Sequence, residues 1–298
     1  MRTSGTGTTR SVRAAALRAA ALVGVLAVAL LSGCDNNATS PAPSSGTSSG
    51  ASSTASPSAS AELITVPVYY ATDTGTDLKL VREFRALPDA GGPALTAAQA
   101  VLAGEPLDPD YTGLWDPAGT VLGIDESSGQ IEVDLSAEAT TTTTGSAGAE
   151  LAVQALVYAV TGALQTDEPV RILVEGEPVD ELFGVLDVRQ PIARADPLSV
   201  RLLVQFNDPN EGDVVGSPVA VSGEAAVFEA TLPWRVETPD GAVVQAGVTQ
   251  TAEGQTFSPF SFEVSLEPGE YVVIITEDDP SDGAGGPLQS DSRGFVVQ

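Results

Sequence analysis

The chain has 298 residues and a formal net charge of −27, and it contains one cysteine and no histidine. The lack of histidine excludes Ser–His–Asp and Cys–His catalysis and removes the commonest metal ligand. A chain this negative repels phosphate backbones, so nucleic acid is a very poor partner.

The first 33 residues have the pattern of a secretory signal peptide. Four arginines precede an apolar stretch at residues 19–31, which is shorter than the roughly 20 residues that span a bilayer. Residues 31–34, Leu-Ser-Gly-Cys, resemble the bacterial lipobox, whose cysteine receives a diacylglycerol before cleavage ahead of it. The alternative is an ordinary signal peptide with an incidental cysteine. We predict removal of residues 1–33 and a lipid on Cys34 that anchors the protein to the extracytoplasmic face of the cell membrane.

Residues 34–61 are predicted to be the lipidated cysteine and a disordered linker. Ser, Thr, Ala, Gly and Pro dominate this segment, which cannot bury enough apolar surface to offset the entropy of ordering. A flexible chain of this length has an r.m.s. reach of roughly 30 Å. Four of the 13 basic residues precede Cys34, so cleavage there leaves nine against 40 acidic residues, a formal charge of −31.

Residues 62–196 are predicted to form an α+β domain with a mixed sheet and two helices. Pro67, in the first strand, indicates an edge strand or a bulge, and Gly104 is expected to end the first helix. Apolar residues at helical spacing predict the helices 94–103 and 149–164. β-Branched and aromatic residues predict strands at 64–70, 78–84, 120–124, 130–135 and 170–174.

Residues 197–298 are predicted to form an all-β domain, an immunoglobulin-like sandwich. Apolar and polar residues alternate from Phe228 through Trp234 to Val236, which is typical of a strand with one buried face. About seven short strands in about 100 residues indicate such a sandwich. We expect Trp234 to belong to its core.

Several segments of the first domain carry a family resemblance. They include Val-Pro-Val-Tyr-Tyr at 66–70, Val-Leu-Ala-Gly-Glu-Pro at 101–106 and the paired stretches 119–124 and 131–136. With these segments, the domain resembles the GerMN domain of sporulation and germination proteins. Residues 216–225, Gly-Ser-Pro-Val-Ala-Val-Ser-Gly-Glu-Ala, resemble the immunoglobulin-like domain of bacterial spore-germination proteins. The two resemblances imply a non-catalytic extracytoplasmic lipoprotein and bring no catalytic residues to this chain.

Two acidic segments are candidate cation sites. Residues 208–213 place Gly212 and Asp213 where an EF-hand needs a ligand and a glycine, so a polar turn is expected instead. Residues 277–282 concentrate four acids and are expected to be a solvated loop, with an adventitious divalent cation as the alternative. We therefore predict no metal ion and no cofactor.

The leading hypothesis is a lipid-anchored binding or scaffolding module of the cell envelope, with an envelope protein or peptidoglycan as its partner and no catalytic residues. A second hypothesis is an envelope glycan hydrolase that uses paired carboxylates. A third is a chaperone-like or signalling lipoprotein that presents the sandwich to a membrane partner. A Ser–Lys dyad would need Lys79, the only lysine, whose neighbours have the pattern of an ordinary half-exposed strand.

Overall fold

The computed structural model describes residues 62–127, 129–141, 144–279 and 287–298. The predicted signal peptide, the lipid site at Cys34 and the linker lie outside the described residues. Strands are the commonest secondary structure of the described chain, which falls within one compact unit, residues 58–298.

The described chain begins with a long hairpin. β1 (Leu63–Asp73) and β2 (Leu78–Pro88) pair antiparallel along their whole length without a bulge. They form a two-stranded sheet, so β1 is an edge strand, which is where proline is tolerated. Val66 and Val68 of β1 are fully buried and belong to the first hydrophobic core.

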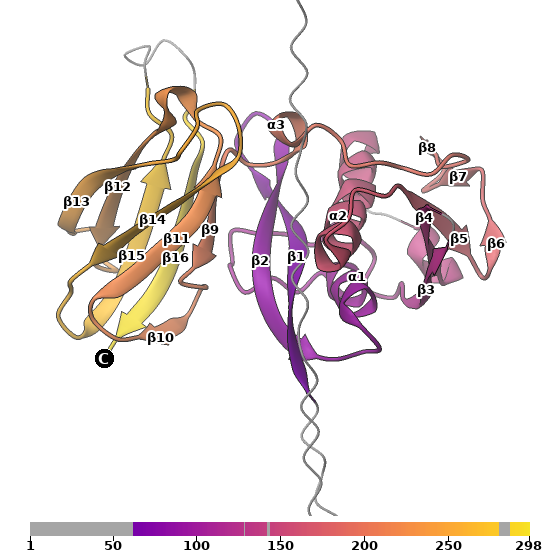
Figure 1. Ribbon diagram of the computed structural model, residues 1–298, viewed down its shortest axis with the longest axis horizontal. Helices are drawn as coiled ribbons and strands as arrows, with labels where there is room; N and C mark the ends of the chain where they lie inside the picture. Colours follow the sequence, from indigo (N-terminus) through magenta and orange to yellow (C-terminus); the bar gives the residue numbers. More distant parts are fainter. Residues whose placement is uncertain (1–61, 128, 142–143, 280–286) are drawn as a thin grey trace, which may run out of the picture. The chain divides into compact units, whose positions relative to one another are not determined.

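Two apolar helices pack against this hairpin (Figure 1). α1 (Pro93–Ala103) ends as predicted at Gly104, which has a φ of +63° and donates its N–H to the carbonyl of Ala100. α2 (Ser146–Leu164) is long and apolar enough to cross a membrane, but 67% of that stretch is buried inside the protein. That burial is what a core helix requires.

A four-stranded mixed sheet, in the order β3–β4–β5–β6, completes the first domain. β3 and β4 form the predicted hairpin, and β4 pairs in parallel with β5. A parallel pair needs a long crossover, which the chain makes through a short 3-10 helix, η1, and α2. The predicted α+β domain with a mixed sheet is confirmed. The remaining elements of this domain are β3 (Val121–Ser127), β4 (Gln130–Leu135), η1 (Ala137–Thr140), β5 (Val170–Val174), β6 (Glu177–Pro178), β7 (Glu181–Leu182) and β8 (Leu186–Asp187).

The second domain is a sandwich of two sheets. One sheet has the order β10–β16–β15–β12–β13, and the other has the order β14–β11–β9 (Figure 1). Inward side chains of both sheets meet in the second hydrophobic core, which confirms the predicted immunoglobulin-like fold. Its strands are β9 (Val204–Asp208), β10 (Asp213–Val215), β11 (Val219–Ala225), β12 (Thr231–Glu237), β13 (Val243–Gln250), β14 (Ser258–Val264), β15 (Gly269–Thr276) and β16 (Ser290–Val297).

The start of β12 differs from the prediction. The short helix η2 (Phe228–Ala230) has left-handed backbone at Glu229 and Ala230, so the regular alternation begins only at Thr231. Phe228 is consequently 47% exposed and lies outside the strand. Trp234 packs against the second core, partly buried, with its ring stacked on Phe262 at 4.6 Å between centroids.

The hydrophobic core changes a few residues after the predicted domain boundary. Asp196 caps the short helix α3 (Pro197–Val200) by accepting a hydrogen bond from the N–H of Leu198 at 3.0 Å. Leu202 still packs in the first core, whereas Val204 packs in the second. The chain therefore passes between the two cores within three residues.

Candidate functional site

A buried carboxylate of the hairpin holds the loop that follows α1. Glu83 of β2 is 4% exposed, and its carboxylate accepts hydrogen bonds from the N–H groups of Leu107 and Asp108 at 2.9–3.1 Å. The guanidinium of Arg85 lies 3.2 Å from the same carboxylate and balances its charge. Charge-assisted hydrogen bonds are stronger than neutral ones, so the backbone around Asp108 is held in one place.

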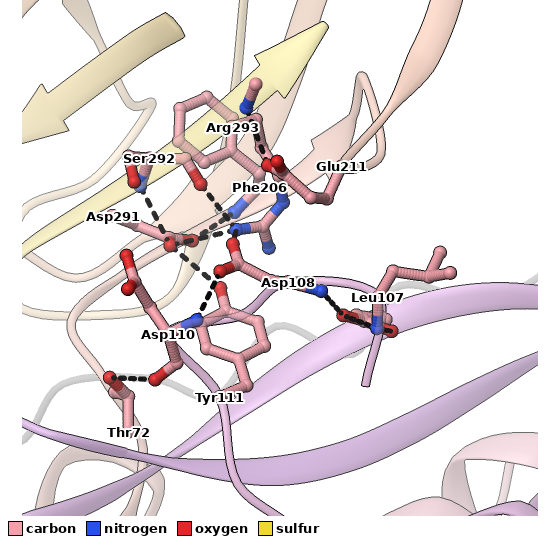
Figure 2. A network of polar contacts seen from close by, with 12 residues as sticks. Thr72, Leu107, Asp108, Asp110, Tyr111, Phe206, Glu211, Asp291, Ser292 and Arg293 are labelled. Carbon is pink, nitrogen blue, oxygen red and sulfur yellow. Dashed lines mark hydrogen bonds and ion pairs between the residues drawn. The ribbon is translucent and has the colours of Figure 1, made fainter. Parts of the chain in front are cut away.

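This loop supplies half of a buried polar network that joins the two domains (Figure 2). Nη1 of Arg293, on β16, lies 2.6 Å from a carboxylate oxygen of Asp108 and 3.0 Å from one of Asp291. The hydroxyl of Tyr111 donates to Asp291 at 2.7 Å. The second oxygen of Asp291 accepts from the N–H of Phe206 at 3.1 Å. Asp108 and Tyr111 come from the first domain, and Asp291 and Arg293 come from the second.

Aromatic rings enclose the guanidinium of Arg293. Its Cζ lies 4.9 Å from the ring centroid of Tyr111 and 5.4 Å from that of Phe206. Arg293 is 2% exposed and Asp108 is equally buried, so these charges are screened little by salt. The arrangement combines ion pairing, hydrogen bonding and cation–π contact on one buried arginine.

The network contains one cation and two carboxylates, and this imbalance affects its protonation. Burial raises the pKa of Asp108 to about 6, although the N–H of Asp110 and the charge of Arg293 oppose the shift. Burial and the charge of Asp291 raise the pKa of Tyr111 well above its ordinary value, so it remains a donor. Burial alone would lower the pKa of Arg293, but Asp291, Tyr111 and Asp108 together raise it.

The sequence analysis missed this network, although its pattern contains a signal. Asp291 and Arg293 share one face of β16 with Phe295 and Val297, and all four are buried. Charged residues in the inward register of an apolar strand indicate a buried, paired group, because a lone buried charge is too costly. The partner Asp108 lies more than 180 residues earlier, and no pattern in the sequence predicts that pairing.

The predicted acidic turn at residues 208–213 is held by hydrogen bonds within it and to neighbouring strands. Asp208 accepts from the hydroxyl of Ser222 at 2.9 Å, and Asp213 accepts from the N–H of Asn210 at 2.8 Å. Glu211 accepts from the N–H of Gly294 at 2.6 Å. In the part of the chain that the structure describes, no group of three or more His, Cys, Asp or Glu is placed to hold a metal ion.

The structure places part of the second acidic segment, and it places Lys79. Residues 277–279 are described, and a carboxylate oxygen of Glu277 accepts from the N–H of Gln289 at 2.7 Å. The rest of that segment lies outside the described residues. Lys79 Nζ lies 2.9 Å from Asp77 and donates to the carbonyl of Ser199 at 2.7 Å. These contacts give Lys79 a structural role at the start of β2.

Asp108 has the raised pKa that a glycosidase acid needs, but its surroundings do not suit catalysis. Its side chain is 3% exposed, and Arg293 and the N–H of Asp110 occupy its two oxygens. A general acid must come within hydrogen-bond distance of the substrate. A sugar could not reach Asp108 without opening the contact between the domains.

Comparison with known proteins identifies both domains. Residues 67–180 match a family model described as sporulation and spore germination. Residues 203–284 match a model described as an immunoglobulin-like domain of bacterial spore germination. A comparison with curated proteins gave no match.

Three solved structures are among those similar to this chain. The first GerMN domain of the sporulation protein GerM from Bacillus subtilis is 19% identical, with a TM-score of 0.37, covering 45% of this chain and 99% of that one. The tandem GerMN domains of the same protein are 15% identical, with a TM-score of 0.39, covering 68% and 61%. CopC from Methylosinus trichosporium is 21% identical, with a TM-score of 0.25, covering 32% and 93%. By these two family models, residues 67–180 are similar to a sporulation and spore germination domain, and residues 203–284 are similar to an immunoglobulin-like domain of bacterial spore germination.

Proposed function

We propose that this protein is a lipid-anchored scaffold on the extracytoplasmic face of the cell membrane, with residues 62–196 and 197–298 as its two domains. The supporting observation is the buried network of Asp108, Tyr111, Asp291 and Arg293. Desolvating each of these ions costs several kcal/mol before pairing. Relative motion of the domains would separate the pairs, so the network favours one fixed arrangement.

A fixed pair of domains suits a protein that positions a partner. Asp108, the acid of this network with a raised pKa, is buried and paired with Arg293, so a substrate cannot reach it. The matched families are described by sporulation and germination and not by a reaction. In this proposal the lipid on Cys34 holds the protein at the membrane. The domains then bind an envelope protein or peptidoglycan, without nucleic acid, metal or cofactor.

The anchor is tested by a Cys34→Ala variant. A thioether-linked diacylglycerol contributes about 0.8 kcal/mol per buried CH₂, and two chains are needed for firm attachment. The variant should therefore leave the membrane fraction after an alkaline wash, whereas the unchanged protein should stay. Equal retention of both proteins would rule out lipid anchoring at this residue.

Binding and catalysis are separated by incubating the mature protein with peptidoglycan and envelope polysaccharides. The scaffold proposal predicts stoichiometric retention on the polymer or capture of an envelope protein by crosslinking in intact cells. The glycan hydrolase alternative predicts soluble product that accumulates with time. Product release that disappears on changing one buried Asp or Glu would overturn the non-catalytic proposal.

A further inference from the structure

A second group of arginines surrounds a cavity that the proposed function does not use. The cavity has a volume of about 350 Å³ and is lined by β1, β2, the C-terminal part of α2 and the first part of the sandwich domain. Three arginines line it, Arg82, Arg194 and Arg201. Only nine basic residues follow Cys34, so a third of them meet here in a strongly acidic chain.

Arg82 and Arg201 are both paired with one carboxylate. Nη1 of Arg82 lies 2.8 Å from Glu224, and Nη2 of Arg201 makes a short ion pair with the same oxygen. Burial alone would raise the pKa of Glu224, but the charges of Arg201 and Arg82 hold it below its usual value. Nη2 of Arg82 also donates to the side-chain oxygen of Asn207 at 2.6 Å. Glu224 is therefore ionised and neutralises only one of the two guanidinium groups.

Aromatic rings fix the planes of these two guanidinium groups. Cζ of Arg82 lies 4.5 Å from the ring centroid of Phe84, and Cζ of Arg201 lies 4.1 Å from that of Phe257. Arg201 is 6% exposed, and among the described residues its Nε and that of Arg82 have no hydrogen-bond partner. The two arginines are thus held in place with positive charge that is not fully compensated.

Arg194 completes the group at the mouth of the cavity. Its Nε donates to the hydroxyl of Thr161 at 2.7 Å, and its Cζ lies 5.1 Å from the ring centroid of Tyr158. Its nearest carboxylate is Asp167 at 3.7 Å, whose side chain is 96% exposed. A pair this exposed contributes little to stability. The side chain of Arg194 is 31% exposed and keeps donors that a ligand can reach.

The charge balance indicates what the cavity can hold. Three guanidinium groups face one part-buried carboxylate and one exposed carboxylate, which leaves an excess of positive charge. Guanidinium forks match the geometry of carboxylate and phosphate oxygens. A volume near 350 Å³ lies at the lower end of small-ligand sites and suits a group of the size of one sugar ring.

We propose that this cavity binds an acidic sugar, with its carboxylate or phosphate held by Arg194 at the mouth and by the positive charge of Arg82 and Arg201 behind it. The shared chemistry is an oxyanion on a sugar-sized body. A uronic acid and a sugar phosphate are its two sources. This binding does not depend on the lipid anchor or on the scaffold proposal, so failure of one does not decide the other.

Isothermal titration of the purified lipidated protein in detergent tests the proposal. The probes are glucuronate and glucose-6-phosphate, with neutral glucose as the control. We expect at least one acidic probe to bind and glucose not to bind. Preference for glucuronate or for the phosphate identifies the source of the oxyanion. If neither acidic probe binds at millimolar concentration, or if glucose binds equally, the proposal is wrong.

Three variants locate the binding. Arg194→Gln should weaken it by about 10-fold or more, because a charge-assisted hydrogen bond contributes about 1.5–3 kcal/mol. Asp167→Asn should strengthen it, because this change removes the carboxylate that competes at the rim. Arg189→Gln is the matched control, since Arg189 pairs with exposed Asp187 outside the cavity. Both variants at the rim change exposed or part-exposed side chains, so their melting temperatures should stay close to that of the unchanged protein. Equal weakening by Arg189→Gln would show general charge attraction and overturn the site.

Discussion

Replacing Arg293 by methionine tests the network between the domains most directly. The variant keeps the volume of the aliphatic stem but removes the only cation between Asp108 and Asp291. Two carboxylates then remain buried without a counter-charge. Breaking a buried pair by removing one partner costs about 3–5 kcal/mol.

The size of this loss can be compared with an exposed pair in the same sheet. Arg235, on β12, pairs with Glu237, and its side chain is 44% exposed. Arg235→Met should therefore cost no more than about 1 kcal/mol. For a protein of this size, about 2–4 °C in melting temperature corresponds to each kcal/mol, so Arg293→Met should lower it by roughly 10 °C.

The assay is urea unfolding followed by far-UV circular dichroism and tryptophan fluorescence, on both variants and the unchanged protein. We expect the unchanged protein to unfold in one transition by both probes. A loss below about 1 kcal/mol for Arg293→Met, equal to that of the control, would refute the reasoning, because the buried charges would then not need their partner.

Three further outcomes are expected. The raised pKa of Asp108, about 6, means that between about pH 4 and 6 the folded state keeps a proton that the unfolded state has lost. This contribution, at most about 3 kcal/mol, is present at low pH and is lost as pH rises through 6. Asp108→Asn should abolish that fall when unfolding is measured across this range, and an unchanged pH profile would contradict the shift. Trp234→Ala should cost at or below the lower end of about 3–5 kcal/mol, because the ring is stacked on Phe262 but only partly buried. With Trp115 replaced by Phe, the emission of Trp234 should be blue-shifted, and a red-shifted, freely quenched signal would mark a surface platform instead. A shortened protein that begins at Glu62 should melt within a few degrees of one that begins at Asp35, and a larger drop would show that the linker contributes to stability.

Much of the first domain follows from local pattern. The two helices, the hairpin of β3 and β4 and the cap at Gly104 were predicted because each depends on residues within about one turn or one strand. The parallel pairing of β4 with β5 was not predicted. It depends on how α2 packs, and helix packing is a property of the whole domain.

In the second domain, the alternation of apolar and polar residues predicts the wrong start for β12. The period of two continued through Phe228 in the sequence, but Glu229 and Ala230 adopt left-handed backbone and end it. Non-glycine residues seldom adopt that conformation, so nothing in the pattern predicted it. From Thr231 onward β12 is a regular strand, so Trp234 packs against the core as the alternation predicts.

The sequence by itself determined the class of each domain and the apolar faces that build its core, because these depend on local propensity and periodicity. It also predicts the lipid site at Cys34, since a lipobox is a contiguous motif, and that prediction stays untested. Only the tertiary structure decided that Asp108 meets Arg293, and that Arg82, Arg194 and Arg201 line one cavity. A buried charged residue needs an oppositely charged partner, and for Arg293 that partner, Asp108, lies 185 positions away along the chain.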